Sequence, residues 1–191
     1  IMNCDINTLT KAEITSKERY LLELVKKLKG ENEYSATAEI SFDKYFNTLS
    51  IKKSEIEKQI FDITREAEEL ARPYISGYGQ KSIKDVEDMI DADQFWLNQK
   101  RNEVVAKEPE LKKAFALLND KIEVARIAVS KLKEIESIKI PKGFSYIGLP
   151  GLRKESAEKL TKIRPENLSQ ADRISGVNPS DISVLMIMLS K

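Results

Sequence analysis

The chain contains no histidine and only one cysteine among its 191 residues. Histidine is the commonest general base and the commonest zinc ligand, so its absence removes the usual catalytic pairs and zinc sites from consideration. The single cysteine, Cys4, excludes a disulfide within the chain, and we interpret it as an incidental thiol. The acid pairs Asp91 with Asp93 and Glu68 with Glu69 are typical of solvated helix faces or caps; a catalytic or metal role is the less favoured alternative. We therefore predict no catalytic residue and no metal site in this chain.

Long apolar runs and glycine-rich motifs are absent as well. No segment is apolar over the length needed to cross a bilayer, and the first residues lack a secretory layout. These absences favour a cytoplasmic protein without a membrane partner. No G-x-G-x-x-G follows a strand pattern, so we do not expect a dinucleotide-binding fold in these residues.

Charged residues of both signs are abundant and nearly balanced. Apolar residues make up 41% of the chain and charged residues 33%, which is typical of a soluble helical protein. The net charge of +1 gives no global basic field. The balance is uneven along the chain, because residues 139–191 hold nine Lys and Arg against five Asp and Glu. Basic charge is therefore displaced toward the C-terminal end.

Helical periodicity dominates the first part of the chain. Thr15 and Glu18 have the spacing of a capping box and precede an apolar stripe, which predicts a helix that starts there. A short helix is predicted over Ser41 to Leu49, with a strand as the alternative that the spacing of Phe42, Tyr45 and Phe46 leaves open. A longer helix is predicted over Ser54 to Leu70, and Pro73 is expected to end it.

The longest helical pattern starts at Pro109, a residue suited to the first turn of a helix. Apolar residues then alternate steps of four and three without a break, which is the pattern of a coiled-coil seam. The seam residues are Leu111, Phe115, Leu118, Ile122, Ala125, Val129 and Leu132. We predict that the Ser54 to Leu70 helix folds back antiparallel against this seam in a bundle. A homodimer joined along the same seam is the alternative.

Three short helical patterns close the chain, each with its own start or stop signal. Pro165 is expected to end the first helix, and Asn167 with Gln170 has the spacing of a capping box for the second. Gly176 can take the left-handed conformation that ends the second helix, and Pro179 suits the first turn of the third. We predict an all-α protein with a helical bundle over residues 1–138 and a compact three-helix unit over residues 139–191, called the terminal module below.

Two features of the terminal module indicate binding chemistry. Five cations lie close in sequence to two helix starts, where unpaired N–H groups favour phosphate. They form either a phosphate-binding surface or an ordinary solvated face; they are Lys154, Lys159, Lys162, Arg164 and Arg173. The last helix is apolar almost all round, so we expect Ile182, Leu185 and Leu189 to lie in the core. Met186 and Met188 are candidates for contact with a partner.

The same residues carry a family resemblance. The string PGLRKESAEKLTKIRP, followed by QADRISGVNPSDISVLMIML, resembles the C-terminal end of the tRNA uridine 5-carboxymethylaminomethyl modification enzyme, the MnmG or GidA family. Weaker similarity at Ser16 to Tyr20, at Ala71 to Pro73 and at Ile138 to Phe144 extends it over most of the chain. One family element, similar to Tyr-Glu-Gly-Tyr, is replaced by Leu118 to Ile122. The matching positions are Leu152, Glu155, Lys159, Leu160, Arg164, Pro165, Gln170, Ala171, Arg173, Ile174, Ser175, Gly176, Val177, Pro179 and Ile182.

The resemblance implies a function for the terminal module. The parent enzyme is expected to use FAD, NADH and a folate one-carbon donor to build a carboxymethylaminomethyl group on the wobble uridine of tRNA. This domain is expected to bind tRNA and to dock the GTP-binding partner enzyme, without carrying out the chemistry. Because the flavin-binding portion is absent, we interpret the chain as a non-catalytic fragment of that enzyme. The alternative is a structural helical-bundle module for protein–protein interaction that binds no RNA.

Overall fold

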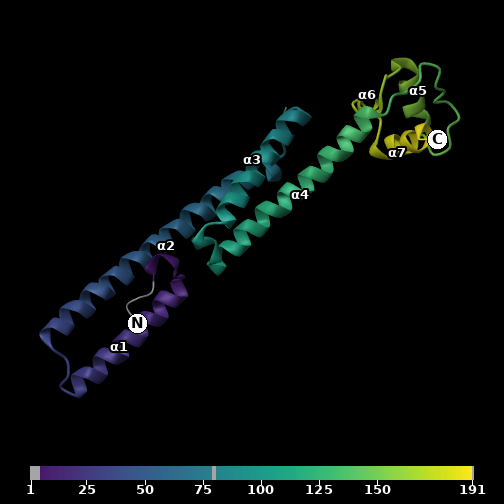
Figure 1. The fold of residues 1–191 in the computed structure, drawn as a ribbon. Helices are drawn as coiled ribbons and strands as arrows, with labels where there is room; N and C mark the ends of the chain where they lie inside the picture. The colour runs from purple at the N-terminus through teal and green to yellow at the C-terminus, as the bar shows by residue number, and fades with distance from the viewer. Residues whose placement is uncertain (1–4, 79–80, 191) are drawn as a thin grey trace. The chain divides into compact units, whose positions relative to one another are not determined.

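A computed structural model describes residues 5–78 and 81–190, so Cys4 lies outside the described residues. The all-α prediction is confirmed, because the described residues form helices and no strand; the only bridge between extended residues in these ranges joins Lys139 and Asn167. In chain order the elements are η1 (Ile6–Thr8), α1 (Lys11–Gly30), α2 (Ala36–Ser76), α3 (Ile83–Arg101), η2 (Val104–Lys107), α4 (Pro109–Ser137), α5 (Lys154–Ile163), α6 (Leu168–Asp172) and α7 (Pro179–Leu189) (Figure 1).

The chain divides into two compact units. The first unit comprises Ile1–Tyr78 and Asp91–Ile122, and the second comprises Gly79–Ile90 and Glu123–Lys191. Helices α3 and α4 therefore contribute residues to both units. The terminal module lies within the second unit. The predicted boundary between residues 138 and 139 stays a prediction.

Helix α1 begins earlier than the sequence predicted. Its capping box is formed by Thr10 and Glu13, with the Thr10 backbone N–H donating to Glu13 Oε2 at 2.7 Å. Thr15 lies inside the helix, where its hydroxyl donates to the Lys11 carbonyl at 2.9 Å. The prediction that Thr15 caps the helix is wrong, because Thr10 and Glu13 have the same spacing and start the helix one turn earlier. The earlier start places Ile14 in the core.

Helix α2 is a single helix of 41 residues, so the prediction of separate helices over Ser41 to Leu49 and Ser54 to Leu70 is wrong. Four apolar residues spaced by seven continue through both predicted segments and are buried: Phe42, Leu49, Ile56 and Ile63. Pro73 does not end α2 but lies in its last turn. A proline there removes only one backbone hydrogen bond near the helix end, and Gly77 terminates α2 with a φ of 84°.

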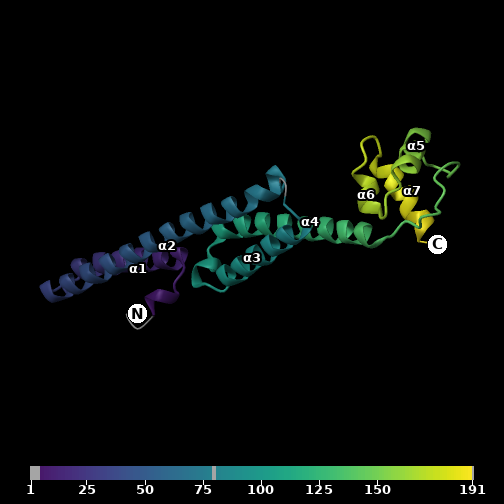
Figure 2. The ribbon, with the colours of Figure 1, turned by 90° about the horizontal axis from the view of Figure 1, so that it is seen from above.

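The predicted seam on α4 is confirmed from Leu111 to Val129, whose apolar members are buried, whereas Leu132 is 44% exposed. Within the first unit, α3 reverses the chain, so α2 and α4 run in the same direction (Figures 1 and 2). The predicted antiparallel pairing of these two helices is therefore wrong. Helix α3 lies between them in the chain and runs in the opposite direction to both, so the chain reverses once before α3 and once after it. Side chains tie α3 to both neighbours: Trp96 Nε1 donates to Glu66 Oε2 at 3.1 Å, and Arg101 Nη2 donates to Asn119 Oδ1 at 3.4 Å.

The terminal module forms the three predicted helices, α5 to α7 (Figure 2). Arg164 ends α5 in the left-handed conformation, with a φ of 55°, immediately before Pro165. Asn167 caps α6 by accepting from the Gln170 N–H at 2.8 Å, as its spacing predicted. Gly176 has a φ of 94° between α6 and α7. The buried core of the module consists of Ile140, Tyr146, Ala157, Leu160, Leu168, Ala171, Ile182 and Leu185.

Candidate nucleic-acid interface

A cleft of about 720 Å³ opens in the terminal module between the segment that enters it and the end of α5. We call it the basic cleft, since three cations and one acid line it. Its lining residues are Lys139, Ile140, Pro141, Lys142, Tyr146, Arg164, Pro165, Glu166 and Asn167. All of them belong to the second unit.

Backbone pairing fixes the two walls of the basic cleft. The Ile140 N–H donates to the Glu166 carbonyl at 2.8 Å, and the Leu168 N–H donates to the Ile138 carbonyl at 3.1 Å. Ile140 and Leu168 are both buried in the core of the module, so apolar burial holds these extended segments together. Lys139 and Lys142, which flank the buried Ile140, are thereby held at the rim.

Arg164 is anchored at the wall of the basic cleft. Pro165 disfavours right-handed helical geometry for the residue before it, and the Arg164 N–H closes α5 on the Leu160 carbonyl at 2.9 Å. The side chain then reaches back, and its Nη1 donates to the Phe144 carbonyl at 2.9 Å. Its guanidinium carbon lies 5.9 Å from the centroid of the Tyr146 ring. The Arg164 charge is therefore positioned by contacts that leave it without a counter-ion.

Tyr146 provides a polar group at the floor of the basic cleft. The residue is only 1% exposed, and its ring packs edge to face against Phe144 with centroids 5.2 Å apart. Its hydroxyl has no hydrogen-bond partner in the part of the chain that the structure describes. Burial raises the pKa of Tyr146 and the nearby Arg164 lowers it, so the phenol is neutral at pH 7 and able to donate. The floor thus carries an unused donor.

The charges of the basic cleft are not neutralised internally. No ion pair involves Lys139, Lys142 or Arg164 among residues 5–78 and 81–190. Glu166 is the only acid in the lining. Three cations against one acid give the cleft a local charge of +2. Such a concave basic surface attracts anions, and phosphate groups in particular.

Of the five predicted cations, only Arg164 lines the basic cleft. Lys159 lies on α5 and donates to Glu155 Oε1 at 2.7 Å, so part of its charge is already compensated. Lys154 and Lys162 are exposed on α5, and Arg173 is exposed at the end of α6. Their predicted role in phosphate binding stays a prediction.

Sequence reasoning missed Lys139 and Lys142, because Ile138 to Phe144 entered it only through the family resemblance and the predicted domain boundary. The proline and glycine residues there did indicate an irregular segment. What they could not indicate is that Ile140 is buried and pairs with Glu166 across the module. The sequence does contain a signal for this site, since the basic Lys139 and Lys142 lie on either side of the apolar Ile140.

The terminal module lies within the part of the chain that matches a family model. A family model described as the tRNA modifying enzyme MnmG/GidA C-terminal helical bundle matches residues 128–191. Residues 128–191 are therefore similar to this bundle and are called the MnmG/GidA bundle below. The basic cleft and all the predicted site residues of this MnmG/GidA bundle lie inside that range.

Relatives extend the similarity beyond the MnmG/GidA bundle. The tRNA uridine 5-carboxymethylaminomethyl modification enzyme MnmG of Christiangramia forsetii is 29% identical over 156 residues, which cover 80% of this chain and 24% of the relative. The enzyme of the same name from Enterococcus faecalis is 47% identical over 70 residues, or 37% of this chain and 11% of the relative. A crystal structure of Aquifex aeolicus GidA aligns with 81% of this chain and 27% of its own, at 25% identity and a TM-score of 0.33. The chain thus spans about a quarter or less of the length of these relatives.

A buried charge network orders the MnmG/GidA bundle, and the sequence analysis did not find it. Asp181 in the first turn of α7 is 1% exposed, and its Oδ2 accepts from four donor groups of three residues. These are Arg153 Nη2 at 2.6 Å and Nε at 3.2 Å, the Ser156 hydroxyl at 2.7 Å and the Asn178 N–H at 2.9 Å. Arg153 also donates to the Gly176 carbonyl at 2.8 Å. The network ties the start of α5 to the start of α7.

The predicted partner residues lie on α7. Met186 is half-buried and packs against the core of the MnmG/GidA bundle, and Met188 is half-buried. The exposed apolar residue between them is Ile187, at 61%. Ile182 and Leu185 are buried in the core as predicted, and the half-buried Leu189 packs against it. Contact of Met186 and Met188 with a partner stays a prediction.

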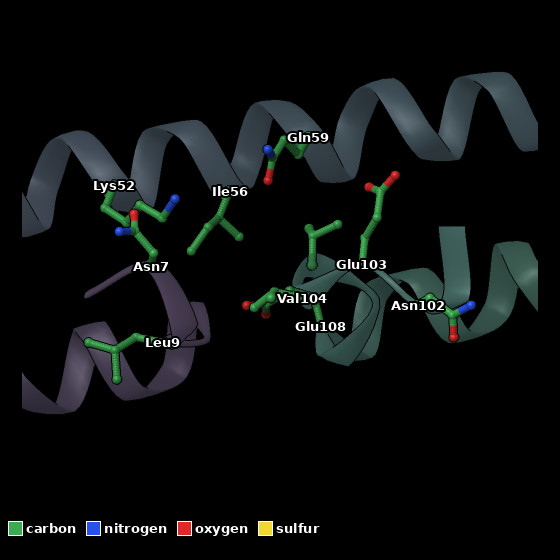
Figure 3. A pocket seen from close by; sticks show the side chains of 10 residues that line it. Asn7, Leu9, Lys52, Ile56, Gln59, Asn102, Glu103, Val104 and Glu108 are labelled. Atoms are coloured by element: carbon green, nitrogen blue, oxygen red, sulfur yellow. The ribbon is translucent and has the colours of Figure 1, made fainter. Parts of the chain in front are cut away.

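A second cavity, of about 350 Å³, lies in the first unit between α2 and the two 3₁₀ helices. Lys52, Ile56 and Gln59 descend from α2, and Asn7 and Glu108 face them from below (Figure 3). Glu108 is 2% exposed and accepts from the Lys11 N–H at 2.6 Å. Lys52 pairs with Glu55 at 3.5 Å, so the cavity presents no unpaired basic charge.

The described residues show neither a metal cluster nor a membrane span. Among residues 5–78 and 81–190, no three His, Cys, Asp or Glu side chains gather in a way that would hold a metal ion. None of the helices in these ranges is both long and apolar enough to cross a membrane.

Proposed function

We propose that this chain is the RNA-binding and partner-docking part of an FAD-dependent tRNA wobble-uridine modification enzyme. The family match supports a place in tRNA modification. FAD and NADH would bind outside this chain, since the described residues offer no strand followed by a glycine-rich turn to hold a dinucleotide. The chain itself contributes binding, not chemistry, and acts in the cytoplasm.

One observation carries the RNA-binding proposal: three cations of the basic cleft lack a counter-ion. A protein cation that is not already paired gains the most from a phosphate, because no internal ion pair must first be broken. Arg164 is also held in place before binding, which lowers the entropy lost on contact. Bidentate contact with a phosphate is the chemistry to which its guanidinium is suited.

The docking part of the proposal concerns α7. Ile187 and the half-buried Met186 and Met188 present an adaptable apolar strip on the last helix. We assign this strip to the GTP-binding partner enzyme. Self-association along the α4 seam has less support, since the seam is buried within the chain from Leu111 to Val129.

The test is binding of fluorescently labelled, unmodified tRNA, followed by anisotropy across a salt series. If Lys139, Lys142 and Arg164 each neutralise one phosphate, the logarithm of the affinity should fall with the logarithm of salt concentration at a slope of roughly −2 to −3. A slope near zero, or no binding at low salt, would contradict the proposal and leave a structural helical-bundle module.

A matched pair of double variants sharpens the test. Lys139→Ala with Lys142→Ala should weaken tRNA binding roughly tenfold and reduce the salt slope by about 2. The control, Lys26→Ala with Lys44→Ala, removes the same charge from exposed lysines of the first unit. The control should bind tRNA nearly as tightly as the parent chain. Equal losses in both double variants would show that charge acts without a defined site.

A further inference from the structure

We infer that the basic cleft holds one unpaired nucleotide of the RNA, with its phosphate among Lys139, Lys142 and Arg164 and its nucleoside on the Tyr146 hydroxyl. The inference rests on the proposed function, because it names the part of the RNA that the basic cleft receives. It goes further by separating single-stranded from double-stranded RNA.

The size of the basic cleft exceeds what a phosphate needs. At about 720 Å³ it lies within the range of roughly 300–1,000 Å³ that is typical of pockets for small organic ligands. A phosphate group held by the three cations at the rim would leave most of this volume to water. The basic cleft therefore has room for a nucleoside attached to that phosphate.

The chemistry of the lining also changes from rim to floor. The cations are exposed, whereas Ile140, Tyr146 and Pro165 are buried and form an apolar floor. Exposed Pro141 and the guanidinium of Arg164 belong to the same lining. A base can lie against such apolar and guanidinium surfaces. The exposed cations thus suit the phosphate of a nucleotide, and the buried apolar residues suit its base.

The Tyr146 hydroxyl is the second, independent sign of a ligand. The side chain is almost fully buried, yet its hydroxyl has no partner in the described part of the chain. The hydroxyl oxygen is not among the fully buried unpaired atoms of the described residues, so it meets the open cleft, where a ligand or water can satisfy it. Phe144 and Arg164 both lie against the ring of Tyr146. The hydroxyl is free to bond a base edge or a ribose hydroxyl.

An unpaired nucleotide fits this arrangement better than a duplex. Bases in an RNA duplex are stacked and paired, so a duplex can offer the rim its phosphates but cannot insert a base to the floor. A single strand can place one base in the basic cleft. The expected preference is therefore for single-stranded RNA, with Tyr146 responsible for part of it.

The experiment measures binding of two labelled probes to the full chain: a seven-residue oligouridine and a blunt RNA duplex of seven base pairs. We expect the single strand to bind at least tenfold more tightly. Tyr146→Phe, which removes only the hydroxyl, should weaken the single strand about threefold to tenfold and leave the duplex unchanged. Lys142→Ala should weaken both probes. Equal thermal unfolding of each variant and the parent chain shows that the fold is intact.

The outcomes separate this inference from the proposed function. Equal affinity for the two probes, or an unchanged Tyr146→Phe variant, overturns the unpaired-nucleotide inference, while loss of tRNA binding in the cation double variant would still support the proposed function. Oligouridine binding without tRNA binding would keep the inference and overturn the proposed function. Displacement of oligouridine by a seven-residue polyglutamate more readily than by unlabelled oligouridine would overturn the inference in favour of an acidic protein partner.

Discussion

Asp93 in the first unit and Asp181 in the terminal module are both buried, but their surroundings differ. Asp93 accepts one neutral donor, the Tyr74 hydroxyl at 2.6 Å, and burial raises its pKa. Asp181 accepts from Arg153, Ser156 and Asn178, and these donors hold its pKa well below the ordinary value despite burial. The number and charge of the donors, not burial, decide whether a buried carboxylate stabilises its unit.

The same contrast applies to the cations. Lys11, Lys53 and Lys100 of the first unit each lie beside a carboxylate. In the terminal module the buried Asp181 pairs with Arg153, while the three cations of the basic cleft are unpaired. Exposed lysines of the first unit such as Lys26 and Lys44 also lack an ion pair among the described residues, so the terminal module differs in that three unpaired cations line one cleft.

The largest expected effect comes from removing the module's buried acid. Asp181→Ala should lower the free energy of unfolding of the terminal module by about 3 kcal/mol, because Ser156 and Asn178 lose their acceptor in a buried site. Hydrogen exchange should show the loss as roughly a hundredfold lower protection in α5 and α7. Asp172→Ala, which removes an exposed acid from the same module, is the control. Unchanged protection in Asp181→Ala would mean that apolar packing alone holds the module.

A smaller effect is the response of the module to acid. The pKa of Asp181 is lower in the folded state than its ordinary value of 3.8, so its stabilisation is present above about pH 4 and is lost as pH falls. Protection of α5 and α7 should therefore decline below that pH. In Asp181→Asn the decline should be weaker, because no carboxylate is left to protonate. A parallel decline in both proteins would assign the acid sensitivity to other groups.

The two regions also show which features of the fold and of the candidate site could be predicted from the sequence. Spacing alone predicted the α4 seam, the cap of α6 at Asn167 and the turn at Gly176, because such signals act within a few residues. It failed at Pro73, since a proline in the last turn and a proline that ends a helix have the same local sequence. The basic cleft and the Asp181 network join residues 20 or more positions apart, such as Ile140 with Glu166 and Arg153 with Asp181. The spacing of residues along the chain does not indicate which residues far apart in sequence come into contact.

The smallest expected effect is at Asp93, where a substitution should stabilise the first unit, whereas Asp181→Ala should destabilise the terminal module. Because burial raises the pKa of Asp93, its charged form destabilises the folded first unit at pH 7. Asp93→Asn removes that charge but keeps an oxygen that accepts from Tyr74, so the variant should resist unfolding slightly more than the parent chain. Trp96 is the only tryptophan and lies in the first unit on α3, so the urea midpoint of its fluorescence reports this unit.

The advantage of Asp93→Asn should depend on pH in a defined way. As pH falls from 7 toward 3.8, the parent Asp93 becomes protonated in the folded state and the two midpoints should converge. Asp120→Asn, at an exposed aspartate of the same unit, should leave the midpoint at pH 7 unchanged. A lower midpoint for Asp93→Asn at pH 7 would show that the charged carboxylate is stabilised after all. The two buried aspartates would then act alike, and the contrast between the two regions would rest on the cations alone.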